Sequence, residues 1–393
     1  MSEIDNLLSF NNQSSELICP IFTNETKYIN EQLSFWVGGV MVCFVTCTGF
    51  LLNLITIYIL YNDSTLKNVF NLLFITLIIN DNISLLLMTF ETFSTNLELH
   101  SWIHDIVYPY FTLPFISISL TAAIFLTIII AHERYMATKY PISHRQSLIS
   151  AFKRRKLFLK YILFVMISTI IINIPKFLEA ELKWKCINYG NQTLFLKQTN
   201  SSEYNETLGF DYSAINLFSD IDDICEVWKP LVRPTRLRMN SYYITYYIVL
   251  TRLLFLGIFP FALLAFLNYR IYHEIQVPSI ITALPELERD NRRKQENDLA
   301  KVLIGIVVIF ILCNFLRVLL DFYEMVNIET IIACNRIGRM GTSSWVIQLN
   351  YFSKLMMATD ASISMVIYCL INKNFRKKLF WWKRLESITT RQT

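Results

Sequence analysis

Long stretches without charge are the feature of this sequence that most restricts its fold. An α-helix needs about 20 predominantly apolar residues to cross the hydrocarbon core of a bilayer. The first such stretch, 32–62, contains no formally charged residue. Seven stretches fit this length, at 32–62, 69–90, 107–131, 157–178, 241–268, 302–322 and 345–371. The sequence therefore predicts an all-α membrane protein built as a bundle of seven transmembrane helices.

The composition points away from a soluble enzyme. Hydrophobic residues make up 53% of the chain and charged residues only 17%, below the roughly 25% usual in soluble domains. The chain has nine glycines, and none of the patterns GxGxxG, GxxxxGK or GxSxG occurs. We therefore expect no enzymatic activity, no organic cofactor and no nucleic-acid partner.

The distribution of basic residues in the short loops predicts the orientation, because Lys and Arg are enriched on the cytoplasmic side. Between the third and fourth stretches lie Arg134, Lys139, Arg145, Lys153, Arg154, Arg155 and Lys156. Acidic residues cluster instead between the fourth and fifth stretches, at Asp220, Asp222, Asp223 and Glu226. We therefore expect a multi-pass plasma-membrane protein with its N-terminus outside and its C-terminus in the cytoplasm.

The same topology divides the chain into three parts. Residues 1–33 are expected to form an extracellular tail, and 34–372 the bundle, with a long second outer loop at 179–240. Residues 373–393 are expected to form an amphipathic cytoplasmic helix and a short tail, since apolar and basic side chains alternate there at helical spacing. Glycosylation sequons on the predicted outer side begin at Asn12, Asn24, Asn191, Asn200 and Asn205.

Four cysteines fall on the predicted outer side, where disulfides can form. They are Cys19, Cys186, Cys225 and Cys334, and four cysteines allow three pairings. The preferred arrangement joins Cys186 to Cys225 within the long loop and Cys19 to Cys334 across the outer face. One bridge with two free thiols is the alternative.

Two carboxylates lie inside predicted spans, Asp81 in the second and Asp360 in the seventh. Ionisable residues within a membrane span are costly to bury and indicate function. If these spans face each other, the two carboxylates share one polar pocket and need a shared proton or a sodium ion between them. Alternatively, Asp360 hydrogen-bonds to neighbouring hydroxyls such as those of Ser362 and Ser364.

Arg317 and Asp321 stand four residues apart in the sixth stretch, on one face of a helix. They either form an ion pair with each other or line a pocket that binds a polar ligand. Arg252 in the fifth stretch adds a second cation at comparable depth. Cations facing one cavity favour a ligand with an acidic or carbonyl-rich group.

An ordered set of motifs resembles a known family. Asn53 lies in the first stretch, NLLFITLIIND ends at Asp81, and Glu133-Arg134-Tyr135 closes the third. Pro260, the run FILC at 310–313 and the run VIYCLINKNFRKKL at 366–379 continue the set. In this order the motifs resemble those of the rhodopsin-like G-protein-coupled receptors, over most of the membrane part of the chain.

The resemblance implies a switch at the cytoplasmic end of the bundle. Arg134 would be held by Glu133 and, across the bundle, by Glu296, until an outward movement of the sixth helix opens a cleft for a heterotrimeric G protein. Tyr135 and Tyr368 complete the implied switch, and arrestin is a further expected partner beside membrane lipids. A guanidinium suits both states because it stays charged.

Within the family, the chain looks most similar to invertebrate receptors of the FMRFamide-receptor-like group. The similar stretches are NIPKFLEAEL, RPTRLRMNSYYITYYI and LCNFLRVLLDFYE. The implied ligand is a short, C-terminally amidated peptide that often ends in Arg-Phe, and acidic residues on the outer face would receive its arginine. The residues expected to bind it are Glu91, Asp105, Arg317, Asp321 and Glu324.

The sequence also departs from the family pattern. Pro109 replaces the cysteine that usually opens the third span, which favours the Cys186–Cys225 pairing. Asn314 replaces the usual tryptophan of the sixth span, and Leu316 the usual proline. The Asn-Pro-x-x-Tyr motif of the seventh span reads Ser-Met-Val-Ile-Tyr at 364–368. These changes predict an altered basal activity.

Two other functions remain as alternatives. An orphan or small-molecule receptor of the same family is one, although an amine receptor would carry an aspartate where Ile116 and Ser117 stand. A transporter or channel is another. Transporters usually show internal repeats and spans interrupted by Gly or Pro, and this sequence shows neither.

Overall fold

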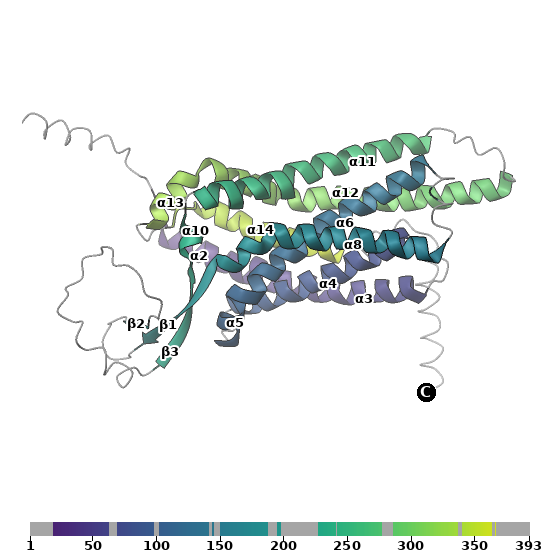
Figure 1. The fold of residues 1–393 in the computed structure, drawn as a ribbon. Helices are drawn as coiled ribbons and strands as arrows, with labels where there is room; N and C mark the ends of the chain where they lie inside the picture. The colour runs from purple at the N-terminus through teal and green to yellow at the C-terminus, as the bar shows by residue number, and fades with distance from the viewer. Residues whose placement is uncertain are drawn as a thin grey trace, which may run out of the picture.

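The computed structural model describes residues 19–62, 69–97, 102–140, 144, 150–187, 195–197, 227–240, 242–276, 286–336, 340–363 and 366. The helices are α2 (Asn24–Leu33), η1 (Ser34–Met41), α3 (Val42–Asn62), α4 (Val69–Thr95), α5 (Trp102–Val107), η3 (Tyr108–Thr112), α6 (Leu113–Lys139), α8 (Ala151–Asn173), η4 (Ile174–Leu178), α10 (Arg236–Met239), η6 (Tyr243–Ile258), α11 (Phe259–Gln276), α12 (Glu286–Val326), α13 (Ile328–Arg336) and α14 (Ser344–Ser362). Figure 1 shows the long helices running side by side as one bundle.

Six of the described helical segments are long and apolar enough to cross a membrane. They are Asn24–Asn62, Val69–Thr95, Tyr108–Lys139, Ala151–Leu178, Tyr243–Glu274 and Ile304–Val326. The seventh predicted span corresponds to α14, which has 19 residues and carries Lys354 and Asp360. It packs against α3, α4 and α12, so it closes the ring of helices. The predicted all-α membrane bundle is confirmed.

The helices carry apolar side chains both on the faces that point into the bundle and on the faces that point out of it. The interior contains buried apolar side chains from α4, α6 and α11, including Leu73, Phe74, Ile130, Leu264 and Ile271. The outer face is also apolar: on α8, Leu163, Phe164, Ile167 and Ile171 are exposed. Helices that are apolar on all sides are expected where lipid, not water, surrounds the bundle.

Several helices extend beyond the predicted spans, and the first and the sixth begin well before theirs. The first starts at Asn24, inside the segment predicted as a tail, after the hydroxyl of Thr23 accepts a hydrogen bond from the backbone of Thr26 at 3.2 Å. The sixth begins at Glu286, well before the apolar stretch. Its first turns are charged, so the hydropathy pattern alone does not reveal them.

A small antiparallel sheet lies at one end of the bundle, within the predicted long loop (Figure 1). Its strands are β1 (Ala180–Ile187), β2 (Phe195–Lys197) and β3 (Val227–Pro234), in the order β2-β1-β3. Ala180 pairs with Pro234 and Ile187 with Val227. Because β3 is an edge strand, it tolerates Pro230 and Pro234. The predicted fold class did not include this sheet.

A disulfide joins Cys19 to Cys334 in α13, which confirms this predicted pairing. It ties the start of the described chain to the segment between α12 and α14, at the sheet-bearing end. Cys225 lies outside the described residues, so the predicted Cys186–Cys225 bridge does too. The predicted amphipathic helix at 373–393 also lies outside them.

Candidate functional site

Glu133 and Arg134 are buried at the end of α6 opposite the sheet, with 3% and 8% of their surfaces exposed. One carboxylate oxygen of Glu133 lies 2.9 Å from the imidazole Nε2 of His144. The other accepts a hydrogen bond from the hydroxyl of Tyr161 in α8 at 3.2 Å. The guanidinium of Arg134 lies 5.4 Å from the ring centre of Phe70. Glu133 therefore ties α6 to α8 and to the segment that follows α6.

Tyr135 links α6 to α11 at the same end. Its hydroxyl accepts a hydrogen bond from Nη2 of Arg270 at 3.5 Å, and the ammonium of Lys139 lies 5.4 Å from its ring centre. The side chain of Glu296 and the whole of Tyr368, the other two predicted switch residues, lie outside the described part of the chain.

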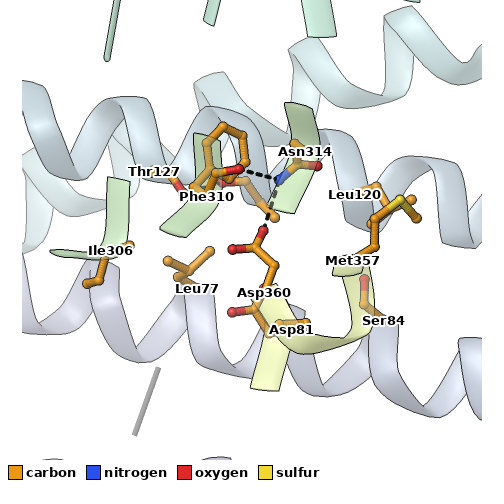
Figure 2. A pocket seen from close by; sticks show the side chains of 12 residues that line it. Leu77, Asp81, Ser84, Leu120, Thr127, Ile306, Phe310, Asn314, Met357 and Asp360 are labelled. Carbon is orange, nitrogen blue, oxygen red and sulfur yellow. Dashed lines mark hydrogen bonds between the residues drawn. The ribbon is translucent and has the colours of Figure 1, made fainter. Parts of the chain in front are cut away.

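A cavity in the middle of the bundle, with both polar and apolar lining, brings together two predicted carboxylates, Asp81 of α4 and Asp360 of α14 (Figure 2). The volume of this cavity is about 40 Å³. The side-chain amide of Asn314 in α12 donates to Oδ2 of Asp360 at 3.1 Å and to the carbonyl of Phe310 at 2.9 Å. Asn314 therefore connects the sixth and seventh helices through a polar contact.

The donor set of this cavity fits a small hard cation. Carboxylate oxygens from two helices lie beside the hydroxyls of Ser84 and Thr127, and such cations prefer oxygen ligands. Asp81 is 6% exposed, so its negative charge has little contact with solvent. A cation would reduce the repulsion between the two carboxylates, and a shared proton would do the same.

A second cavity lies between α6, α8, η4, η6 and α12, nearer the sheet. The volume of this cavity is about 50 Å³. Three cations line it, Lys176, Arg252 and Arg317. The ammonium of Lys176 lies 2.8 Å from Oε1 of Glu179. Nη2 of Arg252 lies 3.5 Å from Oδ1 of Asp321. Of the two alternatives for the sixth helix, the structure favours the one in which Arg317 lines a pocket.

The remaining predicted ligand residues lie apart from this cavity. Glu91 is 3.5 Å from the ammonium of Lys354 in α14, and Lys354 also donates to the side chain of Asn96 at 3.1 Å. Glu324 follows Asp321 in α12 and is partly buried. For Asp105 in α5 the structure describes the backbone only, so the place of its side chain stays a prediction.

Several residues that shape these sites were not predicted as site residues. No motif in the sequence marks Lys176, and Arg252 was named only as a second cation at the depth of Arg317. His144 and Tyr161 lie 11 and 28 residues after Glu133, and no local motif marks them as its partners. Only the assembled bundle shows that these side chains converge.

Among the predicted glycosylation sites, the described part of the chain contains Asn24. Its side chain is exposed at the start of α2. Asn12, Asn191, Asn200 and Asn205 lie outside the described residues.

Comparison with known proteins supports the resemblance seen in the motifs. No protein-family model matches the chain. An FMRFamide receptor of Drosophila melanogaster is 26% identical over 369 residues, which cover 90% of this chain and 55% of that receptor. The chain therefore spans about half the length of the curated relative. This similarity and the membrane bundle confirm the predicted resemblance to receptors of the FMRFamide-receptor-like group.

Proposed function

We propose that this protein is a G-protein-coupled receptor for an extracellular neuropeptide, and that the peptide is short and amidated. The observation that carries the proposal is the similarity, extending over 90% of the chain, to a protein named as an FMRFamide receptor. The membrane bundle supports it, because six helices long and apolar enough to cross a membrane fit a receptor of this kind.

The signalling step assigned to the bundle takes place around Glu133, Arg134 and Tyr135. The bonds from Glu133 to His144 and Tyr161 fix the end of α6 in the present arrangement. Outward movement of α12 would open a cleft beside Arg134 for the G protein, and arrestin would use the same cleft. Glu296 and Tyr368 complete this assignment.

Acidic residues near the sheet-bearing end supply the complementary charge for an arginine of the peptide. Glu91 lies 3.5 Å from the ammonium of Lys354, so a peptide cation would share or replace this contact. Asp105 and Glu324 are assigned to the same role, and Arg317 and Asp321 to the deeper part of the pocket.

The cavity between Asp81 and Asp360 is assigned to a sodium ion that stabilises the inactive bundle. Its support is the set of carboxylate and hydroxyl oxygens that line it. The ion would offset the repulsion between the two carboxylates.

The proposed topology places the N-terminus outside the plasma membrane and the residues 373–393 against the cytoplasmic leaflet. Its support is the basic segment between the third and fourth spans. The five predicted asparagines would then carry glycans, and Cys186 would pair with Cys225. An epitope tag at the N-terminus should be accessible to antibody in intact cells, and loss of staining until permeabilisation would reverse this topology.

The direct test of the function is a panel of amidated peptides applied to cells that express the full chain. Calcium and cAMP are the readouts, and surface expression is measured on the same cells. At least one amidated peptide should give a saturable response that is absent from cells without the receptor. If none responds despite good surface expression, the peptide function is wrong and an orphan or small-molecule receptor replaces it.

A further inference from the structure

The cavity between α6, α8, η6 and α12 has more cations than anions among its lining groups and their partners. Lys176, Arg252 and Arg317 line it, whereas the acids that contact these cations are Glu179 and Asp321. Glu179 pairs with Lys176, and Asp321 is the carboxylate closest to Arg252. Among the residues that the structure describes, no carboxylate pairs with Arg317 alone, so its positive charge is left over.

The guanidinium of Arg317 has a weak hydrogen-bond acceptor beside it. In the described part of the bundle, Nη1 donates to the thioether sulfur of Met357 at 3.7 Å, and thioethers are weak acceptors. Arg252 is near enough to repel it, and Asp321 near enough to attract it. A partly buried guanidinium with five N–H donors is costly to leave without acceptors.

The neutral polar groups of the cavity do not replace an anion. The hydroxyl of Thr121 donates to the carbonyl of Ser117 at 2.8 Å, and that of Thr251 donates to the carbonyl of Tyr246 at 3.2 Å. The hydroxyl of Tyr247 donates to the carbonyl of Ile172. These three hydroxyl donors are therefore already engaged, whereas the cations and the hydroxyl of Ser117 also line the cavity, and the cations are the lining groups that attract an anion.

We propose that this cavity binds a carboxylate group of the ligand, held chiefly by Arg317 with Arg252 beside it. A carboxylate can accept two parallel hydrogen bonds from a guanidinium. The space of about 50 Å³ admits a group of that size, since one water needs about 10–15 Å³ by the same measure. The identification of the ligand as a peptide rests on the proposed function, whereas the carboxylate preference rests on the cavity itself.

Acetate tests the cavity without a known agonist. The thermal unfolding midpoint of the purified full-length protein is measured in sodium acetate, in sodium chloride of equal ionic strength, and in sodium chloride with added acetamide. Acetate should raise the midpoint by about 2 °C or more over both controls, because a ligand that binds only the folded state stabilises it. Equal midpoints in acetate and chloride would overturn the proposal.

Substitutions locate the effect. Arg317→Gln should abolish the acetate shift, and Arg317→Lys should retain part of it. Arg252→Gln provides a second test should Arg317→Gln fail to fold, and it too should remove the shift. Lys183→Gln is the matched control, because Lys183 lies in β1, is 38% exposed in its side chain and does not line the cavity. An acetate shift that survives in both Arg317→Gln and Arg252→Gln would place the anion elsewhere.

Matched peptides then distinguish the two sources of a carboxylate, an acidic side chain and a free C-terminus. Each active peptide is compared with its Asp-to-Asn or Glu-to-Gln analogue, and with its C-terminal acid and amide forms. Arg317→Gln should lower the potency of the form with the recognised carboxylate about tenfold or more, while leaving its neutral analogue unchanged. If no peptide activates the receptor but acetate still binds at Arg317, the peptide function fails and the carboxylate site stands. An equal loss of potency for the acidic peptide and for its neutral analogue would overturn the assignment of the carboxylate to Arg317.

Discussion

At the scale of single residues, the buried charges of this protein are held mostly by contacts between helices. Glu133 is bound by groups from two other segments, and Asp360 by the amide of Asn314 in α12. The sequence shows that these residues are ionisable and lie in or beside apolar spans. Their partners depend on which helices pack together, so no local pattern predicts His144 or Tyr161.

Loss of the contacts to Glu133 should raise signalling without ligand. His144→Gln combined with Tyr161→Phe removes the imidazole and the hydroxyl that hold the carboxylate. Hydrogen bonds to charged groups contribute about 1.5–3 kcal/mol each, so losing them should increase the basal response several-fold. Basal cAMP and calcium are measured at equal surface expression.

Tyr272→Phe serves as the control for this pair, because Tyr272 is exposed on α11. It should leave the basal response at the level of the unsubstituted protein. An unchanged basal response in the double variant would mean that Glu133 does not restrain the switch.

Sodium should stabilise the protein through Asp81. The thermal unfolding midpoint is compared in sodium chloride and in choline chloride at equal ionic strength. We expect a higher midpoint in sodium, and loss of that difference in Asp81→Asn, since the amide replaces a charged ligand of the ion. A sodium effect that persists in Asp81→Asn would argue against this cavity.

At the scale of the elements, the apolar pattern predicts the helices better than it predicts their ends. The spans in the sequence match α3, α4, α6, α8, η6 with α11, α12 and α14. The sheet was not predicted, because β1 and β3 pair across about 40 residues and β3 contains two prolines. The charged start of α12 was missed for a related reason, since its turns lie beyond the apolar stretch.

The close approach of α3 to α14 depends on Gly49. A Cβ at this position would lie 2.0 Å from the hydroxyl oxygen of Ser362 and 3.0 Å from its Cα. Gly49→Ala should therefore force the helices apart and cost about 1–3 kcal/mol, lowering the thermal unfolding midpoint by a few degrees.

Gly257→Ala is the matched control, because its Cβ would meet a side-chain methyl of Val318 at 3.1 Å and no backbone atom of that residue. It should lower the midpoint less. Adding Ser362→Gly to Gly49→Ala should restore part of the loss, and a failure to do so would show that this contact is not the cause.

At the scale of the whole molecule, the bundle places charged groups at both of its ends and in a cavity within an otherwise apolar interior. Cations and the disulfide lie toward the sheet, the carboxylate cavity lies in the middle, and Arg134 lies at the far end. The order of these features along the helices could be predicted from the sequence. Which acid faces which base could not, because it is fixed by packing between helices distant in sequence.

The disulfide between Cys19 and Cys334 should stabilise the sheet-bearing end. Replacing both cysteines with serine removes a crosslink between segments 315 residues apart. We expect a lower thermal unfolding midpoint and weaker peptide binding, with G-protein coupling retained at saturating peptide. Cys47→Ser, at an exposed free cysteine, should change neither property. Identical midpoints for the double variant and the unsubstituted protein would contradict this role.

The most direct measurement of peptide-driven opening at Arg134 is G-protein dissociation, followed by energy transfer between labelled subunits in cells given an active amidated peptide. Full-length receptor should produce a rapid, dose-dependent loss of transfer. Arg134→Ala should abolish that loss while peptide binding at the surface is preserved. Dissociation that proceeds equally in Arg134→Ala, or a peptide that binds without causing any dissociation, would contradict the proposed receptor mechanism.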